Sequence, residues 1–546
     1  MNRNIKVGLA QMNSHVGSIN DNLEKIVKVI KTAKKKKVDL VCFPELALVG
    51  YPPEDLLYNS KFLKSVDSAI KRIQQVEKKV SYIIGYPKLI NGKLYNVAGV
   101  FINGILKHEY QKIYLPNYGV FDEERYFTSG KNPLIFNFKG RSICLTICED
   151  IWGETSIYRN ISKISSCDLM INISASPFSN TKQKDRLKLL SSISKKNNLE
   201  FAYCNMVGGQ DELVFDGGSL FFDSKGALIE KGKDFAEDLV IKNLGKNTQH
   251  KALRIKKETK HYKLSRIFSA LSIGLKDYVL KNGFQKVVIG ISGGVDSALV
   301  AAIACDSLGS KNVLGIAMPT RFNSLLSLEL AKNLSNNLRF SLKVSEIQEI
   351  YEDNLKLLNN SVYGKTLFDI TEENLQARIR ANILMATSNK LGFLLLSTGN
   401  KSETSIGYST LYGDATGGIA ILKDIPKTLV YDLAKYYNYS NPNKLIPFKV
   451  ITRDPSAELR ANQKDSDSLP PYRILDKILE LYMEDGMEAS KIAKALNIKM
   501  SLVKNIVNKL NKSEFKRRQG PIGIKITSKA FGRDRRYPIT NGFKEA

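Results

Sequence analysis

Short runs of apolar residues, bounded by turn residues, dominate the first half of the chain. Seven of these runs predict β-strands, and several are almost continuously apolar, as in strands covered on both faces. They span residues 5–10, 40–43, 82–85, 97–102, 142–147, 169–173 and 201–204. Hairpin turns are predicted at Asn103-Gly104 and at residues 223–226. This pattern predicts a layered α/β sandwich.

The second half alternates short apolar runs with longer helical patterns. A predicted strand at residues 284–291 leads through a glycine turn to a helix at 298–305 and a strand at 312–317. This βαβ order implies a parallel sheet. Helical patterns at 327–336 and 372–390, and a strand at 393–398, continue the alternation. We therefore expect a doubly wound parallel α/β domain.

Apolar periodicity fades between the two halves. Residues 241–264 contain eight Lys and Arg residues and a single Glu, which is typical of a solvated linker. This basic linker would separate a first domain of residues 1–240 from a second domain of residues 265–546. The chain of 546 residues is long enough for each domain to bury its own core.

Composition narrows the class of protein. Hydrophobic residues make up 43% and charged residues 25%, a balance that excludes disorder as the main state. The net charge of +28 invites a polyanionic partner such as nucleic acid. Six cysteines are too few for a dense disulfide framework. The N-terminus has no signal-peptide pattern and no apolar run reaches the roughly 18 residues of a spanning helix, so we expect a cytoplasmic protein without membrane contact.

A glycine-rich loop after the strand at 284–291 carries the most informative chemical pattern. Its glycines let backbone N–H groups approach an anion, its serines can donate hydroxyls, and the next helix presents its N-terminus. Such a loop suits pyrophosphate, and its spacing is neither that of a Walker A loop nor that of a dinucleotide fingerprint. It consists of Gly290, Ile291, Ser292, Gly293, Gly294, Val295, Asp296 and Ser297.

This loop resembles the pyrophosphate-binding loop of the N-type ATP pyrophosphatases, which activate a carboxylate or carbonyl as an adenylate. Further stretches are similar to NAD synthetase, at residues 372–380, 397–403, 411–418 and 516–519. The resemblance implies an adenine nucleotide alpha hydrolase-like fold, with ATP as co-substrate, Mg²⁺ as metal and no tightly bound organic cofactor. It assigns Thr398 to ATP, together with the loop. Asn374, Glu403 and Lys516 would bind deamido-NAD, and Asp296 and Glu403 would bind Mg²⁺.

Three residues of the first half form a candidate nucleophilic site. Cys148 ends the predicted strand at 142–147, Glu45 follows the strand at 40–43, and Lys112 lies between them in sequence. Each residue type alone is weak evidence, because buried thiols and solvated lysines are common. In this order they resemble the Glu-Lys-Cys triad of the nitrilase superfamily, in the form fused to NAD synthetase. Supporting matches lie at residues 43–46, 50–55, 114–122, 174–178 and 208–218.

The resemblance implies a four-layer αββα sandwich and a glutaminase reaction. Glu45 would take the thiol proton of Cys148, the thiolate would attack the glutamine amide, and Lys112 would stabilise the oxyanion. Either Glu123 or Glu124 would be a supporting carboxylate, and the sequence does not say which. The residues expected to hold L-glutamine are Tyr118, Ser176 and Lys182.

Combining both halves predicts the last step of NAD biosynthesis. ATP would adenylate deamido-NAD with release of pyrophosphate, and ammonia made at Cys148 would then displace AMP to give NAD⁺. Because free ammonia is mostly protonated near pH 7, we expect an enclosed passage between the domains. Fused enzymes of this family are generally homo-oligomers, which makes a homo-oligomer the expectation here.

Two alternatives stay open. Another glutamine-dependent adenylating ligase would differ only in its carboxylate substrate, although residues 456–459 and 463–472 favour NAD synthetase. A tRNA-modifying pyrophosphatase-loop enzyme would explain the positive charge, and residues 488–508 are similar to a helix-turn-helix. This segment leads directly into stretches that match the synthetase C-terminus, and there is no aromatic-interleaved RNA-binding strand. We therefore expect deamido-NAD, ATP and L-glutamine as partners and no nucleic acid.

Overall fold

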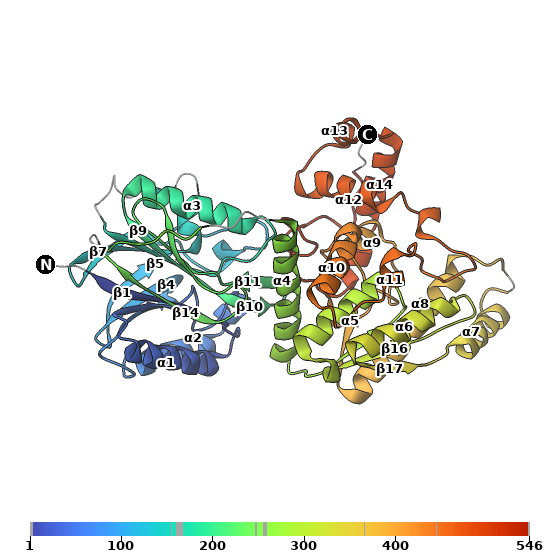
Figure 1. Cartoon of the computed structure of the whole chain (residues 1–546), viewed down its shortest axis with the longest axis horizontal. Coiled ribbons are helices and arrows are strands. Elements are labelled where there is room, and N and C mark those ends of the chain that lie inside the picture. Colours follow the sequence, from blue (N-terminus) through green and yellow to red (C-terminus); the bar gives the residue numbers. More distant parts are fainter. Residues whose placement is uncertain are drawn as a thin grey trace. The chain divides into compact units, whose positions relative to one another are not determined.

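The computed structural model describes residues 4–153, 156–159, 167–245, 248–254, 259–364, 366–443 and 445–543. Contacts between residues divide the chain into two compact units, Met1–Glu258 and Thr259–Ala546. Figure 1 shows the first unit in blue to green and the second in green to red. Within the described ranges, no helix is both long enough and apolar enough to cross a membrane.

The first unit is built on two six-stranded sheets. One sheet, in the order β14-β1-β2-β3-β4-β5, consists of β14 (Asp238–Leu244), β1 (Ile5–Gln11), β2 (Leu40–Cys42), β3 (Ser81–Ile90), β4 (Lys93–Ile102) and β5 (Ile105–Gln111). The other, in the order β13-β12-β9-β8-β7-β6, consists of β13 (Leu228–Lys231), β12 (Leu220–Phe222), β9 (Glu200–Asn205), β8 (Leu169–Ser174), β7 (Arg141–Ile147) and β6 (Leu134–Phe138). A separate ribbon pairs β10 (Val207–Gln210) with β11 (Leu213–Asp216).

Helices cover the outer faces of both sheets. Figure 1 shows α1 (Ile19–Lys35) and α2 (Ser60–Ile73) on one side and α3 (Lys182–Asn197) on the other. The inner faces share one core, to which Leu9 of the first sheet and Ile171 of the second both belong. These layers confirm the predicted αββα sandwich. The predicted strands are all present, and the backbone angle φ is positive at Asn103 (+53°) and Gly104 (+78°) in the turn between β4 and β5, as a type I′ turn requires.

The segment predicted as a linker starts inside a strand and ends inside a helix. β14 continues to Leu244, which pairs with Ile5 of β1, because alternate residues of β14 still face the core. The next helix, α4, spans Lys260–Lys281. Residues 246–247 and 255–258 of the predicted linker lie outside the described residues.

A five-stranded parallel sheet forms the centre of the second unit. Its order is β17-β16-β15-β18-β19, with β17 (Ser341–Val344), β16 (Val313–Ala317), β15 (Val287–Gly290), β18 (Leu394–Ser397) and β19 (Ile419–Ala420). The order reverses at β15, which confirms the predicted doubly wound parallel sheet. At such a reversal the carboxyl ends of neighbouring strands open a crevice that commonly holds a ligand.

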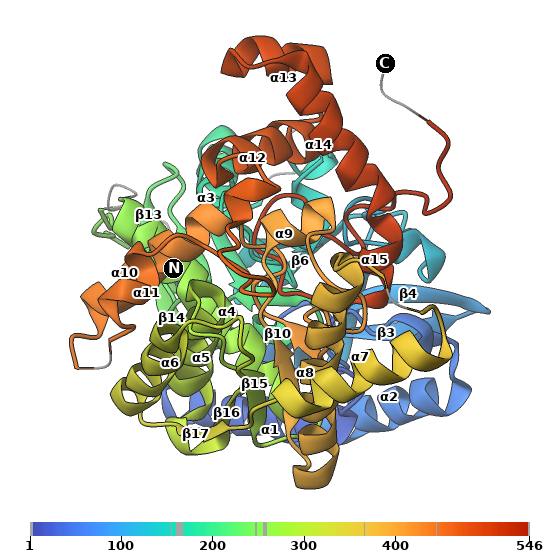
Figure 2. The same cartoon turned by 90° about the vertical axis from the view of Figure 1, so that its right-hand side faces the viewer.

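The helices of this sheet domain lie between and around its strands. They are α5 (Val295–Leu308), α6 (Leu325–Leu338), α7 (Gln348–Ser361), α8 (Ile370–Leu391), α9 (Lys401–Ile406), α10 (Lys427–Ser440) and α11 (Phe448–Thr452). Further helices follow along the chain, namely α12 (Tyr472–Leu479), α13 (Ala489–Leu496), α14 (Met500–Lys512) and α15 (Glu514–Gln519). Figure 2 shows α12, α13 and α14 above the helices of the sheet domain. The helix pair predicted at 488–508 is therefore present, and its apolar faces lie in one core with α12.

Candidate functional sites

A fully buried ion pair joins two of the predicted residues in the first unit. The ammonium of Lys112, which follows β5, lies 2.7 Å from Oε1 of Glu45, which follows β2, and neither side chain is exposed. Nδ2 of Asn96 and the backbone N–H of Ala175 also donate to the Glu45 carboxylate, at 2.8 and 2.9 Å. Because three donors hold it, the position of this carboxylate is closely defined.

The second carboxylate beside Lys112 belongs to Glu123. Both of its oxygens lie 2.8 Å from the Lys112 ammonium, whereas Glu124 points to Asn117 at the surface. Burial raises the pKa of Glu123 to about 7, against the opposing effect of Lys112. Burial would lower the pKa of Lys112, but the charges of Glu123 and Glu45 raise it well above its usual value, so this amine is a permanent cation.

Cys148 lies where β7 turns into a short 3₁₀ helix, Cys148–Ile151. Its φ of +41° is unusual for a residue with a side chain. Burial raises the pKa of the thiol well above its usual value, and the charge of Glu45 raises it further, while Lys112 acts in the opposite direction. The thiol is therefore protonated at neutral pH and requires a base before it can act as a nucleophile.

Two of the residues predicted to hold glutamine, Tyr118 and Lys182, lie close enough to Cys148 to interact with it electrostatically. Tyr118 donates to Oε2 of Glu149 at 3.0 Å, and the ammonium of Lys182 lies 4.1 Å from the centre of the Trp152 ring. Burial lowers the pKa of Lys182, and the neighbouring Glu149 opposes this shift. These residues place a cation and an anion beside the nucleophile, which matches the two charged ends of an amino acid.

Ser176 is held by a chain of buried polar groups. Its backbone N–H donates to Asn205 at 3.0 Å, and Asn205 in turn donates to Asp216 at 3.1 Å. Asp216 forms a buried ion pair with Arg186 of α3 at 3.0 Å. The loop that carries Ser176 is thus fixed to α3.

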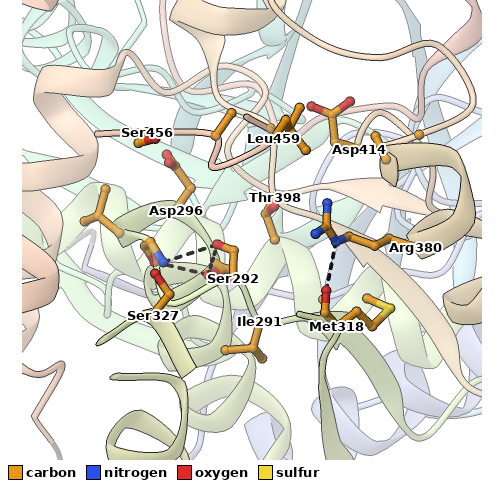
Figure 3. Close-up of a pocket in the computed structure, with 18 of the residues that line it drawn as sticks. Ile291, Ser292, Asp296, Met318, Ser327, Arg380, Thr398, Asp414, Ser456 and Leu459 are labelled. Carbon is orange, nitrogen blue, oxygen red and sulfur yellow. Dashed lines mark hydrogen bonds between the residues drawn. The ribbon is translucent and has the colours of Figure 1, made fainter. Parts of the chain in front are cut away.

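A cavity of about 290 Å³ opens at the carboxyl ends of β15, β16 and β18 in the second unit. Most of the predicted loop lines it, and so do Thr398 and Glu403. Figure 3 shows Asp296, Thr398 and Arg380 around this cavity. Gly293 has a φ of +79°, and a Cβ atom there would lie 2.4 Å from the Ser327 carbonyl oxygen, so only glycine allows this close approach. The cavity lies at the strand-order reversal, where the topology predicts a ligand site.

Lys427 connects the two residues predicted to bind Mg²⁺. Its ammonium lies 2.6 Å from Asp296 and 3.0 Å from Glu403. Tyr472 donates to Glu403 at 3.3 Å and to Asp465 at 2.8 Å. Burial raises the pKa of Glu403 to about 7, Lys427 opposes this shift, and Asp296 adds to it.

Arg380 is a partly buried cation on the opposite side of the cavity. It donates to the carbonyl oxygen of Met318 at 3.0 Å (Figure 3). It also donates to Asn323 at 3.1 Å. Burial lowers the pKa of Arg380 to about 10. The guanidinium is therefore still charged at neutral pH and can attract an anion into the cavity.

Asn374 and Lys516 lie just behind the residues that line the cavity. Asn374 accepts a hydrogen bond from Thr410 at 2.7 Å, and Lys516 donates to the carbonyl oxygens of Gly407 and Ser409, both at 2.9 Å. Thr410 itself lines the cavity. Of the three residues predicted to bind deamido-NAD, Glu403 lines the cavity, whereas Asn374 and Lys516 contact residues at or next to its lining.

Sequence reasoning missed several of the residues that these two sites contain. Lys427 begins a helix in which the sequence singled out no residue, Arg380 ends the stretch 372–380 without a role of its own, and Glu149 carries no pattern except its place after Cys148. The sequence indicated a supporting carboxylate at Glu123 or Glu124 but did not say which of the two it is. Only distances between residues far apart in sequence could identify the others.

Family models match both units. A model described as carbon-nitrogen hydrolase matches residues 6–249, and one described as NAD synthase matches residues 267–520. Full-length relatives are the glutamine-dependent NAD(+) synthetases of Thermotoga maritima, 41% identical, and of Acinetobacter baylyi, 40% identical. The matches cover 100% and 99% of this chain and the same shares of those proteins.

Solved structures match over the same length. The glutamine-dependent NAD+ synthetase from Acinetobacter baumannii, in complex with ADP, has a TM-score of 0.79 at 38% identity and covers 100% of both chains. A second synthetase of this kind, from Cytophaga hutchinsonii, has a TM-score of 0.84 at 22% identity, covers 99% of this chain and 98% of its own, and supports the fold.

Proposed function

The chain belongs to the family of glutamine-dependent NAD(+) synthetases, and we propose that its two units supply the two halves of that reaction. The first unit releases ammonia from L-glutamine, and the second adenylates deamido-NAD and converts it to NAD⁺. The observation that carries the proposal is the division of chemistry. The buried Glu45–Lys112 pair beside Cys148 lies in one unit, and the phosphate loop with its cavity lies in the other.

In the glutaminase half, Glu45 takes the thiol proton of Cys148 as the sulfur attacks the amide carbon of glutamine. The ammonium of Lys112 stabilises the resulting oxyanion. Glu45 then gives the proton to the leaving nitrogen, so that ammonia departs and a thioester remains. A water molecule, deprotonated by Glu45, hydrolyses the thioester to glutamate and restores the thiol. The raised pKa of Cys148 supports this route, because a protonated thiol needs a neighbouring base.

Glutamine is held by Tyr118, Ser176 and Lys182 in this proposal. The ammonium of Lys182 suits the α-carboxylate of the substrate, and the nearby Glu149 suits its α-amino group. Two charged partners of opposite sign on one wall select a free amino acid over a simple amide. The contact of Tyr118 with Glu149 supports this arrangement.

In the synthetase half, ATP binds in the cavity with its phosphates on the loop of residues 290–297 and against Thr398. The nicotinate carboxylate of deamido-NAD, held near Asn374, Glu403 and Lys516, attacks the α-phosphorus, and pyrophosphate leaves. Ammonia then attacks the carbonyl carbon of the adenylate, loses a proton and displaces AMP. Backbone N–H groups of the loop, at the N-terminus of α5, balance the charge of the leaving pyrophosphate.

Asp296 and Glu403 fit the Mg²⁺ site that this chemistry implies. Both carboxylates reach the same Lys427 ammonium, which supports their closeness, and hard divalent cations prefer such oxygen ligands. In the described part of the chain no group of three or more His, Cys, Asp or Glu residues is arranged to hold a metal. The phosphate oxygens of ATP would therefore complete the ligand set. The bound ion would balance phosphate charge during adenylation.

Assembly, location and selectivity for partners are part of the same proposal. We infer a homo-oligomer in the cytoplasm that does not bind nucleic acid. The Lys, Arg, Asp and Glu residues divide almost equally between the two units, which does not favour a single nucleic-acid footprint. Light scattering tests the oligomeric state. Retention on DNA or tRNA at increasing salt concentration tests whether the protein binds nucleic acid.

A two-donor assay tests the division of labour. Purified protein receives ATP, Mg²⁺ and deamido-NAD with either L-glutamine or ammonium, and NAD⁺ is measured. Cys148→Ala is expected to abolish synthesis from glutamine and to preserve synthesis from ammonium. Cys144→Ala, which changes a buried cysteine of the strand that leads to Cys148, is the matched control and should preserve both activities. Loss of both activities in a folded Cys148→Ala protein would contradict the proposal.

A further inference from the structure

One buried carboxylate in the first unit has four donors and no place in the mechanism above. Asp150 is fully buried, two residues after Cys148. Its Oδ1 accepts from the backbone N–H groups of Ile113 at 3.1 Å and Tyr114 at 3.0 Å. Its Oδ2 accepts from the backbone N–H of Ile147 at 2.8 Å and from the hydroxyl of Tyr110 at 2.7 Å. Each oxygen therefore receives two hydrogen bonds.

The positions of these donors along the chain show which segments the carboxylate connects. Ile113 directly follows Lys112, and Ile147 directly precedes Cys148. Lys112 comes from the end of β5 in one sheet, and Cys148 comes from the end of β7 in the other. A single side chain thus binds the backbone on both sides of the gap between the cation and the nucleophile.

We propose that Asp150 is a positioning residue that sets the distance between the Lys112 ammonium and the Cys148 thiol. The inference rests on the proposed glutaminase function and deepens it. Oxyanion stabilisation depends on donor placement, and a displacement of about 1 Å can cost a factor of about 100 in rate. The segment around Cys148 has a positive φ at that residue, so it needs such an external support.

The donors of Asp150 are themselves supported. The hydroxyl of Tyr158 donates to that of Tyr110 at 2.9 Å, and both rings are buried. The Ser156 hydroxyl donates to the carbonyl oxygen of Asp150. The carboxylate therefore has little freedom to move, and it restrains the backbone segments that precede Cys148 and follow Lys112.

Asp150→Asn tests the proposal with almost no change of volume. An amide offers an acceptor at one position only, so at least one backbone N–H must face an NH₂ group. We expect kcat for glutamine hydrolysis to fall about 100-fold, with less than about a threefold change in KM for glutamine, because the glutamine-binding side chains are not touched. NAD⁺ synthesis from ammonium should be unchanged within a factor of about two, since that chemistry lies in the second unit.

The alkylation rate of Cys148 by iodoacetamide, followed by peptide mass spectrometry, gives a second readout that does not depend on turnover. This rate should change by a similar factor in Asp150→Asn, because the surroundings of the thiol change. Asp168→Asn is the matched control, because Asp168 accepts a hydrogen bond from the backbone N–H of Ser142 at the other end of β7. It should leave both kcat and the alkylation rate as in the unaltered protein.

Tyr110→Phe keeps the carboxylate and removes one of its four donors, and it serves if Asp150→Asn fails to fold. A fall of about fivefold to tenfold in kcat for glutamine is expected, without loss of ammonium-dependent synthesis. The inference is overturned if a folded Asp150→Asn protein keeps its kcat for glutamine, or if glutamine and ammonium activities fall equally. Failure of the proposed function has a different signature, since the unaltered protein would then hydrolyse no glutamine.

Discussion

The ammonium of Lys427 lies 2.6 Å from the carboxylate of Asp296, and both residues line the cavity of the second unit. The same ammonium lies 3.0 Å from Glu403, so one cation serves two carboxylates. When both carboxylates are ionised, the three groups together carry a net negative charge. A divalent cation bound beside them would compensate this charge.

Replacing Lys427 by Met should make the protein dependent on Mg²⁺ for its stability. Breaking a buried ion pair leaves uncompensated charge and costs about 3 kcal/mol in the free energy of unfolding. We expect a lower Tm in EDTA at pH 8, and Mg²⁺ should recover more of it in the variant than in the unaltered protein. Lys260→Met is the control, because Lys260 pairs with Asp432 at an exposed position and should cost less than about 1 kcal/mol. Equal effects of Mg²⁺ on Lys427→Met and on the unaltered protein would count against a Mg²⁺ site formed by Asp296 and Glu403.

Adenylation should weaken in acid because of Glu403. Its raised pKa, about 7, means that the carboxylate is half protonated near neutral pH, and a protonated carboxyl is a poor ligand for Mg²⁺. ATP–pyrophosphate exchange with deamido-NAD, which needs no ammonia, should therefore rise as pH increases through about 7. Since Mg²⁺ competes with the proton, a tenfold increase in Mg²⁺ should move the midpoint to lower pH. If the midpoint of this pH dependence did not change with the Mg²⁺ concentration, Glu403 would not be a ligand of Mg²⁺.

Glu123→Gln should damage the glutaminase reaction selectively. The change removes one of the two negative charges that hold the Lys112 ammonium, so the cation shifts toward Glu45. We expect glutamine-dependent synthesis to fall about 100-fold, while ammonium-dependent synthesis is preserved. Glu124→Gln makes the same chemical change at the neighbouring exposed position and should leave both glutamine-dependent and ammonium-dependent synthesis unchanged. If both substitutions had equal effects, the assignment of the supporting carboxylate would be wrong.

Gly293→Ala should separate the two activities in the opposite sense. Its added Cβ would meet the Ser327 carbonyl oxygen at 2.4 Å, so the phosphate loop must move. We expect pyrophosphate exchange to fall at least about 100-fold, with glutamine hydrolysis retained. Gly283→Ala controls for backbone strain, because Gly283 has a φ of +81° but a Cβ added there would meet no atom of the described residues within 4 Å. It should cost only about 1 kcal/mol in stability. Comparable losses of exchange in both variants would contradict a specific role for the loop.

Strand ends were the part of each site that the sequence could indicate. Glu45, Cys148 and the loop that starts at Gly290 all follow apolar runs directly, so the pattern that predicts the strand also places the residue. Lys427 could not be found in this way, because 131 residues separate it from Asp296 and only tertiary packing brings them together.

The strands of the fold likewise differ in how clearly the sequence pattern indicates them. Buried strands such as β8 are indicated by uninterrupted apolar residues, whereas the edge strand β17 is largely exposed and has no such pattern. β14 was obscured because Lys242 and Asn243 stand between its buried residues Val240 and Leu244, at the start of a lysine-rich stretch. Edge strands are selected by the backbone groups of their neighbours, which leave little trace in the amino-acid order.

The protonated state of the Cys148 thiol has a consequence for the life of the enzyme in the cell. Peroxides and electrophiles react with thiolates far faster than with thiols. A buried cysteine whose pKa lies well above its usual value is therefore a poor target while no substrate is bound. Deprotonation coupled to arrival of the amide would confine the reactive sulfur to the moment of turnover, and the enzyme would tolerate oxidative stress that inactivates cysteine enzymes with a resting thiolate.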